Sequence, residues 1–141
     1  MKVLVLIALN LIYFQSNGQQ FKLPCPLKKG VIYKQDKYEA DPGLVLKCAA
    51  TIESNDTIVR ASFNGVVSLV DSSTQMVQVS DKNYIVTYIM KASFVQLGQS
   101  VRIGQVIGRS TPKYLSVFTT YKEKAIEPWK VFMCKCEEYR P

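Results

Sequence analysis

The chain has 141 residues, with 18 basic side chains against 11 acidic ones and a formal net charge of +7 at pH 7. This length suits one globular domain and leaves little room for a second. The lysines are scattered along the sequence, which is typical of a solvated surface, so we expect no nucleic-acid partner. No histidine occurs anywhere in the sequence, and this excludes every site chemistry that depends on imidazole.

Residues 1–18 are typical of a secretory signal peptide. Lys2 supplies a positive start, residues 3–14 form an apolar run, and Ser16 and Gly18 are small residues suited to cleavage before residue 19. A membrane span needs about 20 apolar residues, and this run is shorter. We therefore expect a secreted or periplasmic protein with no transmembrane helix after cleavage, and an uncleaved anchor is the alternative.

Residues 19–40 are mixed and turn-rich, with one short strand expected at 31–33, and we expect them to wrap the edge of a core. Residues 41–50 predict a turn that leads into a buried strand. Segments 57–61 and 65–70 predict a hairpin around Phe63-Asn64, and the Asn64-Gly65 pair is a common hairpin signal. A second hairpin is expected from 76–80 and 84–89, which turns at 81–83.

The stretch 95–108 contains two similar units, L-G-Q-S-V and I-G-Q-V-I. Glycine adopts positive φ without steric cost, so each G-Q step can turn the chain and let the β-branched residues pack on one sheet face. Residues 112–120 alternate apolar and polar side chains and predict a further half-buried strand. These elements together predict a compact antiparallel β fold.

Four cysteines occur, at Cys25, Cys48, Cys134 and Cys136, and they permit three full pairings. Strand alternation would point Cys134 and Cys136 to the same side. A bridge from either of them to Cys25 would join the two flanking segments, and Cys48 would then be bridged or buried free. A zinc site is the alternative, but structural zinc usually takes C-x-x-C spacing with a second ligand pair, so we expect no metal and no cofactor.

Two segments carry a family resemblance: V-x-A-x-x-N-G-V-V at 59–67 and V-x-L-G-Q-x-V-x-x-G-Q-V-I-G at 95–108. Together they resemble the β core of the lysostaphin/LytM-type peptidoglycan metalloendopeptidases, also called the duplicated hybrid motif. The resemblance implies an all-β, compact antiparallel β-sandwich over residues 41–132. Residues 133–141 would then form a C-terminal tail that contains Cys134 and Cys136.

The catalytic motifs of that family hold zinc with two histidines and an aspartate. On the family pattern H-x-G-x-D, the histidine position holds Asp41 and the aspartate position holds Val45. Tyr84 and Tyr88 match two tyrosines of a later motif, and Met90 stands where a catalytic-site histidine is expected. Methionine can neither accept nor donate a proton in catalysis.

The family's second histidine pair falls on the strand at 112–120, in one of two registers. It lies either on Tyr114 and Ser116 or on Leu115 and Val117, and neither pair offers two zinc ligands. We therefore expect no catalytic residue and no metal-binding residue in this chain.

The resemblance implies a secreted, non-catalytic domain that binds cell-wall peptidoglycan or regulates an envelope protein, a pseudoenzyme of this peptidase family. The expected contact surface is a groove formed by Tyr84, Tyr88, Met90, Tyr114 and Ser116. Two alternatives stay open: a metalloendopeptidase with unusual ligands, such as Asp41 with a cysteine, and a secreted structural or signalling domain of the same fold.

Overall fold

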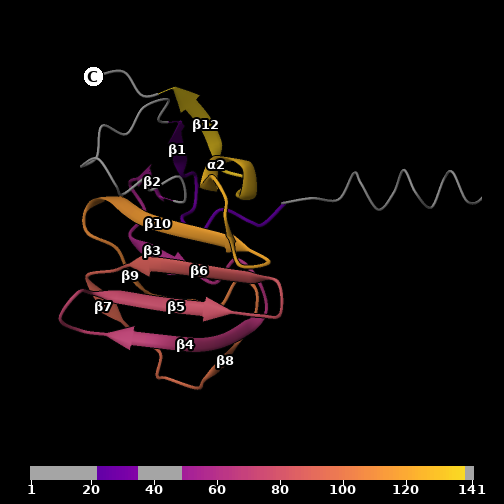
Figure 1. Ribbon diagram of the computed structural model, residues 1–141. Coiled ribbons are helices and arrows are strands. Elements are labelled where there is room, and N and C mark those ends of the chain that lie inside the picture. The colour runs from indigo at the N-terminus through magenta and orange to yellow at the C-terminus, as the bar shows by residue number, and fades with distance from the viewer. Residues whose placement is uncertain (1–21, 35–48, 139–141) are drawn as a thin grey trace, which may run out of the picture.

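A computed structural model describes residues 22–34 and 49–138, which form a nearly all-β protein with one sheet of nine strands and one of three (Figure 1). The larger sheet contains β1 (Val31–Lys34), β2 (Ala49–Ser54), β4 (Gly65–Asp71), β5 (Met76–Ser80), β6 (Tyr84–Ile89), β8 (Ser100–Val101), β10 (Lys113–Tyr121), β11 (Lys124–Ala125) and β12 (Lys135–Glu138). The smaller sheet contains β3 (Ile58–Arg60), β7 (Ala92–Ser93) and β9 (Val106–Arg109). The predicted all-β fold is confirmed.

The strand order of the larger sheet is β12-β1-β2-β10-β6-β5-β4-β8, with β11 paired to β10 at the side. Neighbouring strands in both sheets are antiparallel, as predicted, except that β1 and β12 are parallel. The sheet therefore extends beyond the predicted core of residues 41–132, since β1 and β12 belong to the two predicted flanking segments.

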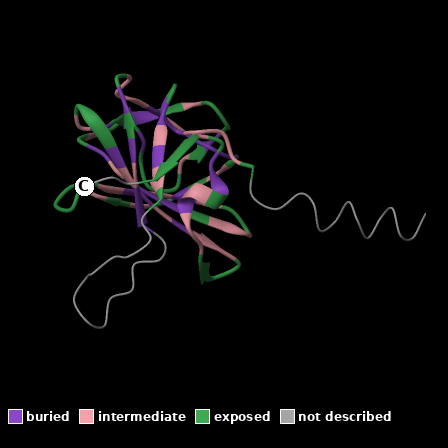
Figure 2. Cartoon of the chain, turned by 90° about the horizontal axis from the view of Figure 1, so that it is seen from above, coloured by how far each residue is buried: buried purple, intermediate pink, exposed green. Residues whose placement is uncertain are grey.

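The core lies between the sheets, on the inner face of the larger one. Ile52, Val86 and Leu115 on three of its strands are each 0% exposed, and Figure 2 shows buried positions interspersed with intermediate and exposed ones along the strands. Burying each such side chain contributes roughly 1.5–3 kcal/mol. A single helical turn, α2 (Pro128–Val131), places Val131 in the same core.

One predicted hairpin is confirmed and the other is wrong. β5 and β6 form the expected antiparallel pair. By contrast, β3 pairs with β9 in the small sheet, whereas β4 pairs with β5 and β8 in the large one. Neither Asn64 nor Gly65 has positive φ, which the two-residue turn requires at both central positions. Asn64 instead accepts a hydrogen bond from the Ile103 amide at 2.8 Å, where the chain crosses between the sheets.

The two G-Q units form two matching turns. Gly98 and Gly104 have φ of 84° and 83°, which suits the third position of a type II turn. Each turn is closed by a backbone bond, Gln99 N to Gln96 O at 3.1 Å and Gln105 N to Arg102 O at 3.0 Å.

Each glutamine side chain supplies a second bond to its own turn. The amide oxygen of Gln99 accepts from Gln96 N at 3.1 Å, and that of Gln105 accepts from Arg102 N at 3.0 Å. The expectation that the β-branched residues here pack on one sheet face is wrong for Ile103 and Val106, which are 53% and 40% exposed. Leu97 and Ile103 occupy the outer corners of the two turns, and Leu97 is 70% exposed.

The two flanking segments are joined by a disulfide between Cys25 and Cys134, 109 residues apart in sequence. Beside it, Leu23 N donates to Val131 O at 2.9 Å and Met133 N donates to Leu23 O at 2.8 Å. This is one of the pairings that the sequence left open. Cys136 is free and exposed.

Several predictions fall outside the described residues: the signal peptide, Asp41, Val45 and Cys48. Within residues 22–34 and 49–138, no helix has the length and apolar character needed to cross a bilayer.

Removing the disulfide should destabilise the fold. A Cys25→Ser/Cys134→Ser double variant frees a loop of more than a hundred residues in the unfolded chain, so we expect the free energy of unfolding to fall by about 2–5 kcal/mol. Urea unfolding followed by circular dichroism measures the change. The control is Cys136→Ser, which removes the free thiol and should leave the midpoint in place; a double variant as stable as the parent would contradict the prediction.

Candidate functional site

The pairing of β6 with β10 decides which predicted site residues share a face. Val117 lies opposite Tyr88, and Ser116 lies opposite Ile89. Because successive side chains on a strand point to opposite faces, Tyr88 and Val117 face the core and Ser116 faces outward. The register therefore places Ser116 and Val117 on opposite faces of the sheet, although they are adjacent in sequence.

The expected five-residue groove is not assembled. Tyr88 and Met90 are buried in the core, at 0% and 2% exposure, whereas Tyr114 is 53% exposed. Tyr114 and Ser116 alternate with the buried positions of β10, so both lie on the opposite face of the sheet. Tyr84 is half-buried on the inner face beside other aromatic rings. These five residues do not line one surface.

A different set of motif positions shares the inner face: Met90, Leu115 and Val117. Met90 follows Tyr88 by two residues and so lies on the same side, and all three side chains are at most 2% exposed. Gly108 packs against Met90, because a methyl group added to it would lie 2.8 Å from the Met90 sulfur and would strike the Ala92 carbonyl. The space at these positions is filled by apolar side chains.

The described residues do not fit the zinc that the resemblance implies. Zinc in proteins takes imidazole, thiolate or carboxylate ligands, and the chain has no imidazole. Among residues 22–34 and 49–138, no three cysteine, aspartate or glutamate side chains are grouped closely enough to hold a metal ion. Cys25 and Cys134 are also consumed by their disulfide.

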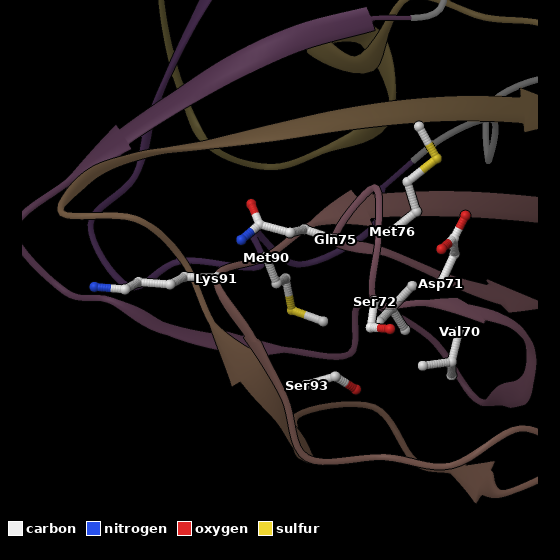
Figure 3. A pocket seen from close by; sticks show the side chains of 9 residues that line it. Val70, Asp71, Ser72, Gln75, Met76, Met90, Lys91 and Ser93 are labelled. Atoms are coloured by element: carbon white, nitrogen blue, oxygen red, sulfur yellow. The ribbon is translucent and has the colours of Figure 1, made fainter.

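A small pocket of about 130 Å³ opens beside Met90, between the β4–β5 turn and β7. In Figure 3 the Met90 thioether lies among the lining residues, and Lys91 extends away from them. The pocket is lined by Val70, Asp71, Ser72, Gln75, Met76, Val77, Met90, Lys91 and Ser93. Apart from Met90, no residue of this pocket was predicted from the sequence, because a polar turn carries no motif.

The β4–β5 turn at the pocket is fixed by its own hydrogen bonds. The Asp71 carboxylate accepts from the Ser73 amide at 3.0 Å and from the Ser73 hydroxyl at 2.7 Å. These bonds, together with those from Thr74, hold the pKa of Asp71 below its ordinary value. The carboxylate is therefore charged at neutral pH but is committed to the turn.

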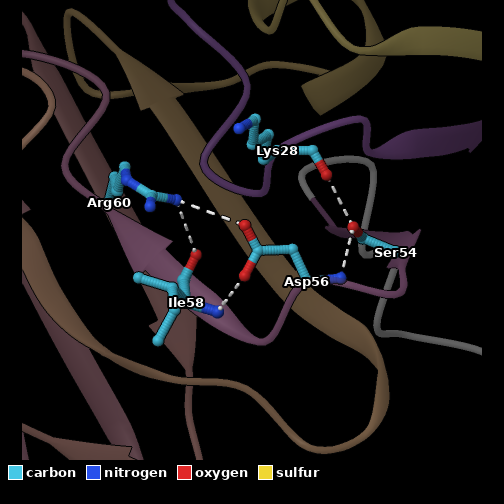
Figure 4. A network of polar contacts seen from close by, with 5 residues as sticks. All are labelled: Lys28, Ser54, Asp56, Ile58 and Arg60. Carbon is cyan, nitrogen blue, oxygen red and sulfur yellow. Dashed lines mark hydrogen bonds and ion pairs between the residues drawn. The ribbon is translucent and has the colours of Figure 1, made fainter.

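A second polar network, drawn in Figure 4, fixes the loop between β2 and β3. Ser54 donates its hydroxyl to the Lys28 carbonyl at 2.7 Å and accepts from the Asp56 amide at 3.1 Å. Asp56 accepts from the Ile58 amide at 2.9 Å and pairs with Arg60 at 3.4 Å. Each group acts within the loop or on the N-terminal segment, so this network holds the fold in place.

Among residues 22–34 and 49–138, three buried side-chain hydroxyl groups make no hydrogen bond, those of Ser62, Tyr88 and Thr120. Burial raises the pKa of Tyr88 to about 12, and the neighbouring Ser62 lowers it in part. An unpartnered buried hydroxyl costs free energy, so Tyr88 is held in place by packing.

Tyr88 should make the protein sensitive to alkali. Its native pKa lies above the unfolded value of 10.0, so the stability that it contributes is complete below pH 10 and is lost as the pH rises toward 12. Between about pH 9 and pH 11, the parent should lose roughly 1 kcal/mol more unfolding free energy than Tyr88→Phe. Urea titrations at both pH values test this, and parallel losses in the two proteins would refute it.

No protein-family model matches the sequence, and no curated protein matches it either. Solved structures do match. The catalytic domain of the prophage-encoded M23 protein EnpA from Enterococcus faecalis superposes with a TM-score of 0.55 and 20% identity, over 75% of this chain and 94% of that one. Csd3 from Helicobacter pylori gives a TM-score of 0.59 and 20% identity, over 86% of this chain and 37% of that one.

Lysostaphin from Staphylococcus simulans, described as an antimicrobial peptidase, gives a TM-score of 0.50 and 18% identity, over 69% of this chain and 48% of that one. At these identities the likeness concerns the fold. The chain has the β fold of M23 peptidase domains, the fold that it shares with lysostaphin.

Proposed function

We propose that this chain is a secreted, non-catalytic domain with the M23 peptidase fold that binds cell-wall peptidoglycan. One observation carries the proposal: Met90, Leu115 and Val117 share the inner face and are buried together. The family resemblance calls for a histidine at Met90 and, in one of its two registers, for a histidine pair at Leu115 and Val117. Hydrophobic packing there favours a stable scaffold over a metal centre, because an unpaired charge in such a place is costly.

The pocket beside Met90 replaces the expected groove as the proposed contact surface. It combines apolar side chains of Val70 and Met76 with hydroxyl and amide groups of Ser72, Gln75 and Ser93. A volume of about 130 Å³ is small for a ligand site, so it suits one small residue of a wall peptide. The Cys25–Cys134 disulfide supports an extracytoplasmic location, where such bonds persist.

Sedimentation with purified peptidoglycan tests the binding. We expect the protein to sediment with the insoluble wall fraction. A Ser93→Arg substitution, which fills the pocket mouth, should lower the affinity for peptidoglycan about tenfold, or about 1.4 kcal/mol. Ser100→Arg is the matched control, since both serines are exposed and lie in two-residue strands. Failure of the parent to sediment, with capture of one defined envelope protein, would favour the regulatory alternative.

Elemental analysis tests the absence of catalysis. The purified protein should hold far less than one zinc per chain after growth with added zinc, and its addition should release no new amino groups from peptidoglycan. Stoichiometric zinc together with peptide-bond cleavage would contradict the proposal and establish the metalloendopeptidase with unusual ligands.

A further inference from the structure

Strand β12 forms an open edge of the larger sheet. It stands at one end of the strand order, and within residues 22–34 and 49–138 it pairs with β1 alone. All four of its residues are exposed. An exposed strand edge presents unpaired N–H and C=O groups that can accept another strand.

The backbone orientation shows which residues of β12 face this edge. The Lys135 amide donates to the Gly30 carbonyl at 3.1 Å, on the β1 side. Because the N–H and C=O groups of successive residues point to alternate edges of a strand, those of Cys136 and Glu138 point outward. Cys136 is therefore placed to exchange two backbone hydrogen bonds with an incoming strand.

The side chains around Cys136 are self-complementary in charge. Lys135 and Glu137 lie on either side of it and on one face of the strand, where they form an ion pair at 3.0 Å. If two copies of β12 pair antiparallel with Cys136 opposite Cys136, each Lys135 lies opposite a Glu137. Opposite charges directly across an antiparallel pair are favourable, and like charges are unfavourable.

We propose that β12 is a docking edge for a second copy of this chain, which pairs antiparallel about a two-fold axis at Cys136 and joins two large sheets into one. The two-fold axis uses the same patch on both partners, as homodimers commonly do. The other end of the sheet is the two-residue strand β8, which offers less backbone to pair. Four residues bury little area, so the dimer is weak and reversible.

Charge reversal tests the pairing without the thiol. In a Cys48→Ser/Cys136→Ser background, sedimentation equilibrium should detect a dimer at high protein concentration. Lys135→Glu puts four acidic groups across the axis and should weaken association about tenfold, and Lys135→Glu with Glu137→Lys should restore it. Lys82→Glu, in the exposed β5–β6 turn, is the control for net charge and should have no effect. A monomer at every concentration, or a Lys135→Glu dimer as tight as the parent, would overturn the proposal.

Crosslinking tests the register. In Cys48→Ser protein, Cys136 is the free thiol, and paired residues of this kind lie about 5.5 Å apart between Cα atoms, within disulfide range. Diamide as oxidant takes two electrons and two protons from two thiols, so a disulfide-linked dimer should form rapidly. Glu138→Cys in a Cys48→Ser/Cys136→Ser background should crosslink more slowly, because position 138 does not face its own copy. Equal rates would exclude the proposed axis. This inference is independent of peptidoglycan binding.

Discussion

The alternation of side chains across the β6–β10 pair decides which residues share each face of the large sheet. With Val117 opposite Tyr88, one face of the large sheet receives Met90, Leu115 and Val117, and the other receives Tyr114 and Ser116. A shift of one residue would exchange these sets, since the period of a strand is two. Burial of the inner set fixes the register, because a shifted strand would bury polar groups and expose core side chains.

The same inner face carries apolar side chains at the motif positions of the peptidase fold that the structure describes. A sheet that holds a metal carries polar groups on its inner surface, and each such group needs a partner when it is buried. Here aliphatic and thioether side chains occupy the corresponding strands, and Gly108 allows β9 to approach Met90 closely. The pocket beside Met90 has few charged groups that could act on a ligand. Asp71 is hydrogen-bonded within the β4–β5 turn, and Lys91 extends away from the other lining residues.

The sequence predicted the features that depend on neighbours in the chain. The β5–β6 hairpin and the two G-Q turns follow from local turn chemistry, and both were found. Pairing between strands that are far apart in the sequence could not be predicted from local turn chemistry. The predicted hairpin at 57–70 was wrong because β3 pairs with β9, which is distant in sequence, and the parallel contact of β1 with β12 likewise has no local sequence signal. The prediction of a five-residue groove was wrong for the same reason, because only the register of β6 against β10 shows that Ser116 and Tyr88 lie on opposite faces.

The parallel contact of β1 with β12 has a consequence for biogenesis. Val31 pairs with Lys135, so β1, the first described strand of the larger sheet, can complete its pairing only after β12, the last one, has been synthesised. Contacts so distant in sequence form slowly. Cys25 must therefore remain reduced, or be reshuffled, until Cys134 has been synthesised, and a nascent chain carries β1 without its outer neighbour.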